Sequence, residues 1–354
     1  MKIMTVLGTR PEIIRLSRII PLLDAHASHV LVHTGQNYDD RLNGLFMREL
    51  SVREPDVLMN VRAEGFGAQV GQILAGIESV LLEHRPDRLL VLGDTNSGLA
   101  AIVARRLGIP VFHMEAGNRC YDDRVPEEVN RRIIDHSSTV LMPYTQRSRE
   151  NLLAEGIPGA RVLVTGNPIH QVLQYHESAI RSSTCLQTLG LDERRYFLTT
   201  IHRAENVDAE DTLRQLVTAF IQLYERFGFP VVCSFHPRTR AKAARFGVGV
   251  DHPGLRFIEP LGFFDFVRLE RSAFCILSDS GTVQEEACIF RVPNVTLREV
   301  TERPETVECG SNLLSGTRPD DIAAAVTLAT KSPVNWQPPP EYLAPLVAET
   351  VVRI

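Results

Sequence analysis

Short apolar runs alternate with longer amphipathic stretches along this chain, and no other feature limits the possible folds as strongly. The first half contains such runs at residues 2–8, 29–35, 87–95, 109–117, 138–144 and 161–168. Each run has the length of a buried strand, and helical sequence follows several of them. Strand-then-helix alternation predicts parallel sheets with helices on both faces.

The same pattern starts again after the middle of the chain. Further apolar runs cover residues 196–203, 230–239, 255–260, 273–281 and 292–299, and the 354 residues exceed what one hydrophobic core usually serves. The polar, helical stretch 168–195 separates the two halves. We therefore predict a Rossmann-like domain over 1–167, a second one over 168–340, and a final apolar helix, 341–354, that packs back on the first domain.

Composition excludes several classes of protein. A 44% hydrophobic and 23% charged chain is ordinary for a globular protein, and a net charge of -5 provides no positive field for nucleic acid. No apolar run approaches the roughly 20 residues of a membrane helix, and the first residues do not resemble a signal peptide. The six cysteines are scattered, without a C-x-x-C pair, as in reduced thiols. We expect a cytoplasmic protein with no nucleic-acid or membrane partner.

The sequence G-T-R-P-E at 8–12 follows the first predicted strand. Gly8 would let the backbone approach a ligand, and Pro11 suits the first turn of a helix. Arg10 would then stand where a phosphate or carboxylate could be held, although a tight turn with a solvated arginine explains the residues equally simply. No G-x-G-x-x-G fingerprint is present, so a nicotinamide cofactor is not expected.

The sequence S-D-S-G-T-V-Q-E-E-A at 278–287 joins another predicted strand to a helix. Ser280 is a good N-cap residue, and the amides of the first helical turn, from Gly281 onwards, form an anion site. Glu285 and Glu286 stand about 100° apart on the helix, so only one can face a ligand and hold ribose hydroxyls. The alternative is a capped structural helix with surface glutamates.

Acidic residues gather at strand ends in the first half. Asp94 and Glu115 follow neighbouring predicted strands, and Glu127 and Glu128 follow Pro126. Carboxylates crowded at one sheet edge raise one another's pKa, which suits an acid and a base near neutral pH. Simpler roles remain open, because Asp94 could cap a helix and the two glutamates could pair with Arg131 or Arg132.

Two histidines end strands in the second half. His202 and His236 each have an arginine one or two residues further on, and they could contact a phosphate or move protons. Either could instead be structural. No close spacing of His, Cys and Asp predicts a metal site. The charged stretch at 298–310 is interpreted only as a loop with charge pairs.

Together these residues resemble the non-hydrolysing UDP-N-acetylglucosamine 2-epimerases. The resemblance implies the two-Rossmann glycosyltransferase-B fold with a cleft between the domains. It also implies inversion of carbon 2 of a UDP-linked 2-acetamido sugar by elimination and re-addition of UDP, without nicotinamide or metal. The matching stretches, in order, are GTRPE (8–12), TGQNYD (34–39), LGDTNS (92–97), HMEAGNR (113–119), PEEVNRR (126–132), TGNP (165–168), HRAEN (202–206), SDSGTVQEEA (278–287) and TERPE (301–305).

The resemblance also implies roles for single positions. The acidic catalytic residues are Asp94, Glu115 and Glu127, and the catalytic-site histidine is His202. A further active-site arginine is Arg131. The nucleotide contacts are Arg10, Arg203, Ser280, Gly281 and Glu286, with Glu286 on the ribose.

Several positions depart from the usual family pattern. Arg124 replaces a common aromatic residue, Thr282 replaces a glycine, and Asn37 follows Gln36 where a histidine is usual. The loop 62–72 lacks the form that binds a second, activating UDP-sugar in some bacterial members. The branch that forms UDP-N-acetyl-L-fucosamine from its L-talo epimer is more similar in five stretches, AGNRC, DDRVPEE, HRAENVD, SFHPRTR and SDSGT.

Other functions remain open at this stage. A hydrolysing relative would use the same cleft to release UDP and free sugar. A glycosyltransferase of the same fold would need an acceptor. A UDP-sugar-binding protein without catalysis is the non-enzymatic alternative. The family pattern further implies a homodimer with a UDP-sugar as its substrate.

Overall fold

The computed structural model describes residues 1–35, 40–63, 65–234, 237–249, 251–331 and 333–354. The chain forms two compact units, the first built from residues 1–175 and 340–354 and the second from residues 176–339. None of the helices in the described part combines the length and apolarity needed to span a lipid bilayer.

The first unit is built on a parallel sheet of six strands in the order β3-β2-β1-β4-β5-β6. This is the order of a doubly wound Rossmann sheet, in which the direction of winding reverses between β1 and β4. The strands are β1 (Lys2–Leu7), β2 (Ser28–His33), β3 (Val57–Leu58), β4 (Arg88–Leu92), β5 (Val111–Met114) and β6 (Val140–Met142).

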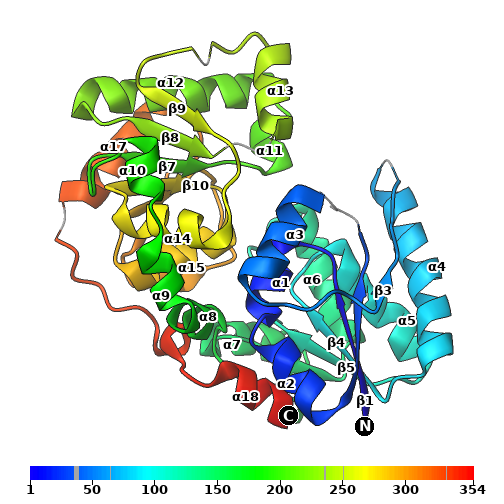
Figure 1. Cartoon of the computed structure of the whole chain (residues 1–354). Helices are drawn as coiled ribbons and strands as arrows, with labels where there is room; N and C mark the ends of the chain where they lie inside the picture. The colour runs from blue at the N-terminus through cyan, green and yellow to red at the C-terminus, as the bar shows by residue number, and fades with distance from the viewer. Residues whose placement is uncertain (36–39, 64, 235–236, 250, 332) are drawn as a thin grey trace. The chain divides into compact units, whose positions relative to one another are not determined.

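Helices cover both faces of this sheet (Figure 1). They are α1 (Arg10–Leu16), α2 (Ile19–His26), α3 (Asp40–Glu49), α4 (Phe66–His84), η1 (Asn96–Leu99), α5 (Ala100–Arg106), α6 (Pro126–Ser137), α7 (Gln146–Ala154), η2 (Gly159–Arg161), α8 (Ile169–Tyr175), η3 (Pro340–Leu343) and α18 (Val347–Arg353).

The second unit repeats the same topology. Its six parallel strands lie in the order β12-β11-β10-β7-β8-β9, so the winding reverses between β7 and β10. The strands are β7 (Phe197–Thr200), β8 (Val231–Ser234), β9 (Leu255–Ile258), β10 (Cys275–Ser278), β11 (Asn294–Thr296) and β12 (Asn312–Leu314). The two Rossmann-like sheets confirm the predicted α/β fold class.

The helices of the second unit also lie on both faces of their sheet (Figure 1). They are α9 (Glu177–Ser182), α10 (Cys185–Leu189), α11 (Ala204–Val207), α12 (Glu210–Phe227), α13 (Pro237–Arg245), α14 (Phe263–Ser272), α15 (Gly281–Phe290), α16 (Pro304–Glu308) and α17 (Pro319–Lys331).

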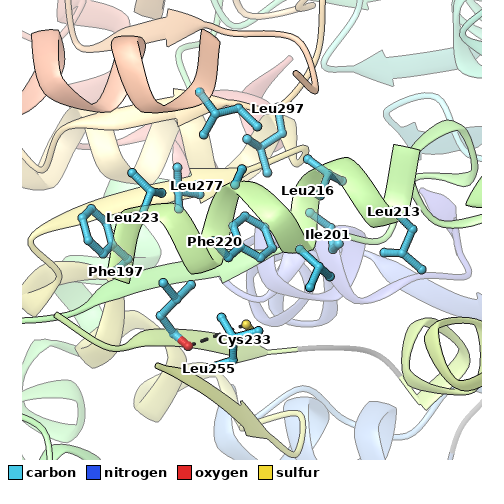
Figure 2. Close-up of a cluster of buried hydrophobic side chains, with 14 of the residues drawn as sticks. Phe197, Ile201, Leu213, Leu216, Phe220, Leu223, Cys233, Leu255, Leu277 and Leu297 are labelled. Carbon is cyan, nitrogen blue, oxygen red and sulfur yellow. Dashed lines mark hydrogen bonds between the residues drawn. The ribbon is translucent and has the colours of Figure 1, made fainter. Parts of the chain in front are cut away.

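Helix α12 shows how the sequence builds the core of the second unit. Its buried residues recur every three or four positions and include Leu213, Leu216 and Phe220, which is the spacing of one helical face. Figure 2 shows side chains of this face gathered with strand residues such as Phe197 and Cys233. Complete burial of a side chain such as Phe220 contributes roughly 1.5–3 kcal/mol, so this face holds the helix on the sheet.

Three predicted elements differ from the structure because of proline. The helix expected from Pro11 to residue 26 is interrupted after Leu16, because Pro21 has no amide hydrogen for the Ser17 carbonyl and its ring would clash with it. Likewise, the final helix begins only at Val347, after Pro345.

The run 161–168 is not a strand, which corrects the third prediction. Leu163 and Thr165 donate backbone hydrogen bonds to the carbonyls of Leu141 and Pro143, so this segment does lie beside β6. Pro143 cannot donate a bond in return, and a single bridge, from Leu141 to Val162, remains.

The first unit extends beyond the predicted junction to Tyr175, and it includes the end of the chain. Helix α8 buries Ile169, Val172 and Leu173 and contacts α1. Helix α18 lies against α2 (Figure 1). The Gln171 side chain accepts a hydrogen bond from the Ala348 amide at 2.9 Å, which fastens the last helix to α8.

Candidate functional site

The predicted functional residues of the first unit stand where its winding reverses. Gly8 follows β1 and Gly93 follows β4, and these two strands are hydrogen-bonded neighbours. In open α/β sheets, ligands bind outside the carboxyl ends of the strands at this point. Arg10 is the first residue of α1, and its guanidinium lies 5.7 Å from the ring centre of Phe46.

Glu12 joins the two loops at this point. Its carboxyl group accepts hydrogen bonds from the Gly8 amide at 3.1 Å, the Thr9 hydroxyl at 2.7 Å and the Thr95 hydroxyl at 3.3 Å. Burial raises its pKa to about 7, although these hydrogen bonds oppose the rise. The T-x-x-E spacing of Thr9 and Glu12 is that of a capping box, so the sequence offered a signal for this residue.

Asp94 is held by an arginine from α6. Arg131 places Nε at 2.8 Å and Nη2 at 2.7 Å from the same Asp94 oxygen, and its Nη1 donates to Glu128 at 2.7 Å. The side chain of Asp94 remains 24% exposed, whereas those of Arg131 and Glu128 are buried. Arg131 therefore holds Asp94 in place, while part of the Asp94 side chain stays accessible.

Glu128 organises the loop before α6. Burial alone would raise its pKa, but hydrogen bonds from the Cys120 amide, from Arg131 and from the Tyr121 amide outweigh burial and hold that pKa below the usual range. It also contacts Arg132 at 3.4 Å, so the predicted helical pair exists with both arginines. Its neighbour Glu127 lies half-buried in the first turn of α6.

Glu115 adopts a strained backbone conformation at the end of β5. Its φ of 63° lies in the left-handed region, which is uncommon for residues other than glycine and often marks functional sites. Its carboxylate lies 3.5 Å from Nε of the buried Arg15. A Cβ atom built on Gly93 would lie 4.0 Å from Cδ of Glu115. The carboxyl group of Glu115 thus stands beside the turn that carries Asp94.

The predicted functional residues of the second unit also stand where its winding reverses. His202 and Arg203 follow β7, and Asp279 and Ser280 follow β10. His236 lies outside the described residues. Among the described positions, the strand-end residues again lie where ligands bind in open α/β sheets.

Asp279 fixes the turn that carries His202 and Arg203. It accepts the His202 amide at 3.1 Å, the Arg203 amide at 3.0 Å and Nδ1 of His202 at 3.1 Å. Burial would raise the pKa of Asp279, but the charge and hydrogen bonds of its partners lower that pKa to about 2. The imidazole of His202 is 53% exposed, so Asp279 orients a ring that remains accessible.

Arg203 is held in place on two sides. Its Nη2 lies 3.0 Å from one oxygen of Glu302, whose other oxygen lies 2.8 Å from Arg298, and its Nε donates to the Asp279 carbonyl at 3.3 Å. Glu302 belongs to the stretch interpreted only as a loop with charge pairs. Its function in positioning Arg203 had no local signal in the sequence.

Helix α15 begins at Gly281, and Ser280 occupies the N-cap position. The Ser280 side chain makes no capping hydrogen bond, contrary to the predicted cap, because its hydroxyl pairs with that of Thr282 at 3.0 Å. An anion could therefore cap this helix instead. A Cβ atom on Gly281 would lie only 2.6 Å from Glu302, so glycine is needed for this close approach.

The two adjacent glutamates of α15 have different partners, as their angular separation predicts. Glu285 forms an ion pair with the buried Arg303. Glu286 lies close to the fully buried Glu270 of α14. Burial, and the nearby negative charge of Glu286, raise the pKa of Glu270 well above its ordinary value. Glu270 therefore favours its protonated form in the folded protein.

Comparison with known proteins identifies the family. The model of the UDP-N-acetylglucosamine 2-epimerase family matches residues 23–354. The chain belongs to this family.

Individual members of this family match the chain over nearly its whole length. A UDP-N-acetylglucosamine 2-epimerase of Methanocaldococcus jannaschii is 40% identical over 96% of this chain and 95% of its own length. A UDP-2,3-diacetamido-2,3-dideoxy-D-glucuronate 2-epimerase of Pseudomonas aeruginosa is 35% identical over 91% of this chain and 90% of its own.

One solved structure covers the whole of this epimerase-family chain. The crystal structure of the M. jannaschii UDP-GlcNAc 2-epimerase in complex with UDP-GlcNAc and UDP matches with a TM-score of 0.95 and 38% identity. The match covers 100% of this chain and 99% of that one.

The contact between Gly281 and Glu302 predicts the effect of one added methyl group. We expect Gly281→Ala to lower the free energy of unfolding of the second unit by about 1–3 kcal/mol, the usual cost of overpacking. Chemical denaturation would measure the loss. Gly249→Ala is the matched control, because a Cβ atom there meets nothing within 4 Å. Equal stability of the two variants would contradict the prediction.

The protonated Glu270 predicts a pH-dependent stability. Unfolded Glu270 ionises above its ordinary pKa of 4.5 while the folded residue stays protonated, so unfolding releases a proton and stability falls as pH rises. Glu270→Gln has no such proton. The free energy of unfolding of Glu270→Gln, relative to that of the wild type, should therefore grow by up to about 1.4 kcal/mol per pH unit above pH 4.5, until the folded Glu270 of the wild type ionises.

Urea unfolding of the two proteins at a series of pH values tests this. Glu225→Gln, at an exposed position of α12, is the control and should show no growing difference. A stability difference for Glu270→Gln that stays constant with pH would show that Glu270 is ionised in the folded protein.

Proposed function

We propose that this chain inverts carbon 2 of a UDP-linked 2-acetamido sugar and interconverts UDP-N-acetylglucosamine and UDP-N-acetylmannosamine. The observation that carries the proposal is the placement of Asp94 and Glu115 at adjoining strand ends, in a chain of this family. The crystal structure of the M. jannaschii relative with UDP-GlcNAc and UDP supports the choice of ligand.

The chemistry requires the leaving group to depart first. Carbon 2 has no adjacent carbonyl group, so its proton is not acidic enough for direct removal and return. When UDP leaves carbon 1, the neighbouring carbon becomes electron-poor and its proton can be removed. Elimination gives a 2-acetamidoglucal, and re-addition of UDP with the proton on the opposite face gives the epimer. The reaction thus needs cationic stabilisation of UDP together with carboxylates for the proton.

The second unit supplies the groups for UDP in this proposal. The amides that open α15 at Ser280 and Gly281 bind the diphosphate, and Arg203, already fixed by Glu302, neutralises the charge that develops on it. Glu286 accepts the ribose hydroxyls. The fully buried Glu270 lies close to it, and burial together with the negative charge of Glu286 raises the pKa of Glu270.

The first unit supplies the acid and base groups. Asp94, Glu115 and Glu127 are proposed as the acidic catalytic residues. Arg131 holds the Asp94 side chain in place through Nε and Nη2. Arg10, at the start of α1, is proposed as a further phosphate contact.

His202 is suited to act on the leaving diphosphate. Asp279 holds its Nδ1, and this partner leaves Nε2 as the position that can donate or accept a proton. The exposed ring can therefore meet a ligand in a fixed orientation. His236 is proposed as an additional substrate contact on the sequence pattern alone.

Loss of a single acidic group tests the proposed catalytic residues. We expect Asp94→Asn, Glu115→Gln and Glu127→Gln each to lower turnover by at least ~100-fold, the usual scale for an acid or base. Asp123→Asn is the control, because this acidic residue lies in the loop before α6 and its side chain is 69% exposed. Near-normal turnover in any of the three variants would remove that residue from the mechanism.

The reaction itself is tested by proton NMR in deuterated water. We expect deuterium at carbon 2 and formation of the epimer without free sugar. Stoichiometric release of UDP and sugar would indicate a hydrolysing enzyme, turnover only with an acceptor would indicate a glycosyltransferase, and UDP binding without exchange would indicate a binding protein.

The sugar is tested in the same experiment. The panel includes UDP-N-acetylglucosamine, UDP-N-acetyl-L-fucosamine and a UDP-2,3-diacetamido-D-glucuronate, because the sequence variants and the P. aeruginosa relative point to these alternatives. The substrate with the highest kcat/KM identifies the sugar, and a preference for UDP-N-acetylglucosamine is the expected result.

We further propose that the chain is a homodimer that acts in the cytoplasm, as the family resemblance implies. Light scattering of the purified protein should give twice the mass of 39.6 kDa, and a monomer at all concentrations would contradict this.

A further inference from the structure

His113 is a buried histidine for which the proposed mechanism has no use. It lies on β5 with a side chain only 1% exposed. Its Nδ1 lies 2.8 Å from Oδ1 of Asp135 on α6, and its Nε2 lies 2.9 Å from the carbonyl oxygen of Gly93. Both ring nitrogens are therefore engaged by oxygen atoms of other elements.

Neither partner of His113 can donate a hydrogen bond. A backbone carbonyl only accepts. Asp135 is ionised, since its other oxygen accepts the Gly117 amide at 3.1 Å and lies 2.8 Å from Nη2 of Arg119. Burial would raise the pKa of Asp135, but its bonds to His113 and the charge of Arg119 hold that pKa below the usual range. Each nitrogen of His113 must then carry a hydrogen, which makes the ring an imidazolium.

The surrounding charges balance this cation. Arg119 donates to Asp135 and also makes two bonds of 2.7 Å to Glu155. Two cations and two anions thus form one chain from β5 to the end of α7. The further titratable group at its end is the exposed His136, 3.5 Å from Glu155. A buried charge is tolerated where it is paired and hydrogen-bonded in this way.

The pair of His113 and Asp135 lies between the two turns that carry proposed catalytic residues. Gly93, whose carbonyl is held by His113, has a φ of 71° and directly precedes Asp94. Gly117, whose amide is held by Asp135, closes the turn that begins at the strained Glu115. One ion pair therefore fixes the turn before Asp94 and the turn after Glu115.

We propose that His113 is a permanently protonated positioning residue that sets the separation between Asp94 and Glu115. This inference rests on the proposed functions of these two carboxylates. A neutral imidazole could donate only one of the two hydrogen bonds, and it would leave the Gly93 carbonyl or an Asp135 oxygen buried without a partner. Loss of the proton would release one of the two turns.

His29 provides an internal control in the same sheet. Its Nδ1 also pairs with an aspartate, Asp24, at 2.6 Å, but its Nε2 lies 2.8 Å from the Thr5 hydroxyl. A hydroxyl can donate or accept, so this ring is not required to be charged. Burial lowers the pKa of His29, although Asp24 opposes the change.

The charge is measured by nitrogen NMR of the full chain labelled at histidine. Both ring nitrogens of His113 should give the imidazolium signals from about pH 6 to pH 8, the range in which ordinary histidines lose their proton. His29 should lose its proton at a lower pH than His113. Signals of a neutral tautomer for His113 would overturn the proposal, whatever reaction the protein catalyses.

The positioning role is measured by kinetics of carbon-2 exchange. His113→Asn should lower kcat at least about tenfold with little change in KM or in UDP affinity, whereas the control His29→Asn should keep kcat. His113→Gln, which retains one N–H donor, should fall between His113→Asn and the wild type, and it replaces His113→Asn if that variant does not fold. Unchanged kcat in the His113 variants would overturn the positioning role.

The two failures can be told apart. If the wild type exchanges no carbon-2 proton with any UDP-sugar of the panel, the proposed function is wrong and the positioning role falls with it. The nitrogen spectra still decide whether His113 is charged.

Discussion

Hydrogen bonds from backbone amides to buried carboxylates hold the functional loops of both units. Parallel strands end at the same edge of a sheet, and the chain leaving each strand has amides that the sheet no longer pairs. A carboxylate accepts two or more such bonds and strengthens them by its charge. The acceptors are Glu12 for Gly8, Asp135 for Gly117, Glu128 for Cys120 and Tyr121, and Asp279 for His202 and Arg203.

In this arrangement, one set of residues holds the loops and another set faces the solvent. The carboxylates that hold the loops are buried, while the side chains presented by those loops keep part of their surface in solvent, as Asp94 and His202 do. Buried anions need compensation, and most of them face an arginine or a histidine rather than water. These hydrogen bonds are made by the chain's own groups, so they can hold the loops in place before a ligand binds, as electrostatic catalysis requires.

The sequence predicted the strands and the strand-end residues well, because continuous apolar runs mark strands buried on both faces. It did not predict β3 and β12, which are two and three residues long, and it overestimated the run 161–168, where Pro143 prevents pairing. The supporting carboxylates escaped detection for a different reason. Asp279 lies 77 residues from His202, and only the fold brings them together. Two of them do carry a local signal, Glu12 in its spacing from Thr9 and Glu128 in its helical spacing from Arg131 and Arg132.

The return of the chain end to the first unit has a consequence for synthesis. Residues 340–354 complete this unit, and Val347, Ala348 and Val351 are buried in it. A ribosome makes these residues only after the whole second unit. The first unit is therefore completed later than the second, and until then a nascent chain exposes the apolar surface of α2 and α8 that α18 and η3 cover. A chain that stops before residue 340 would leave this surface in solvent.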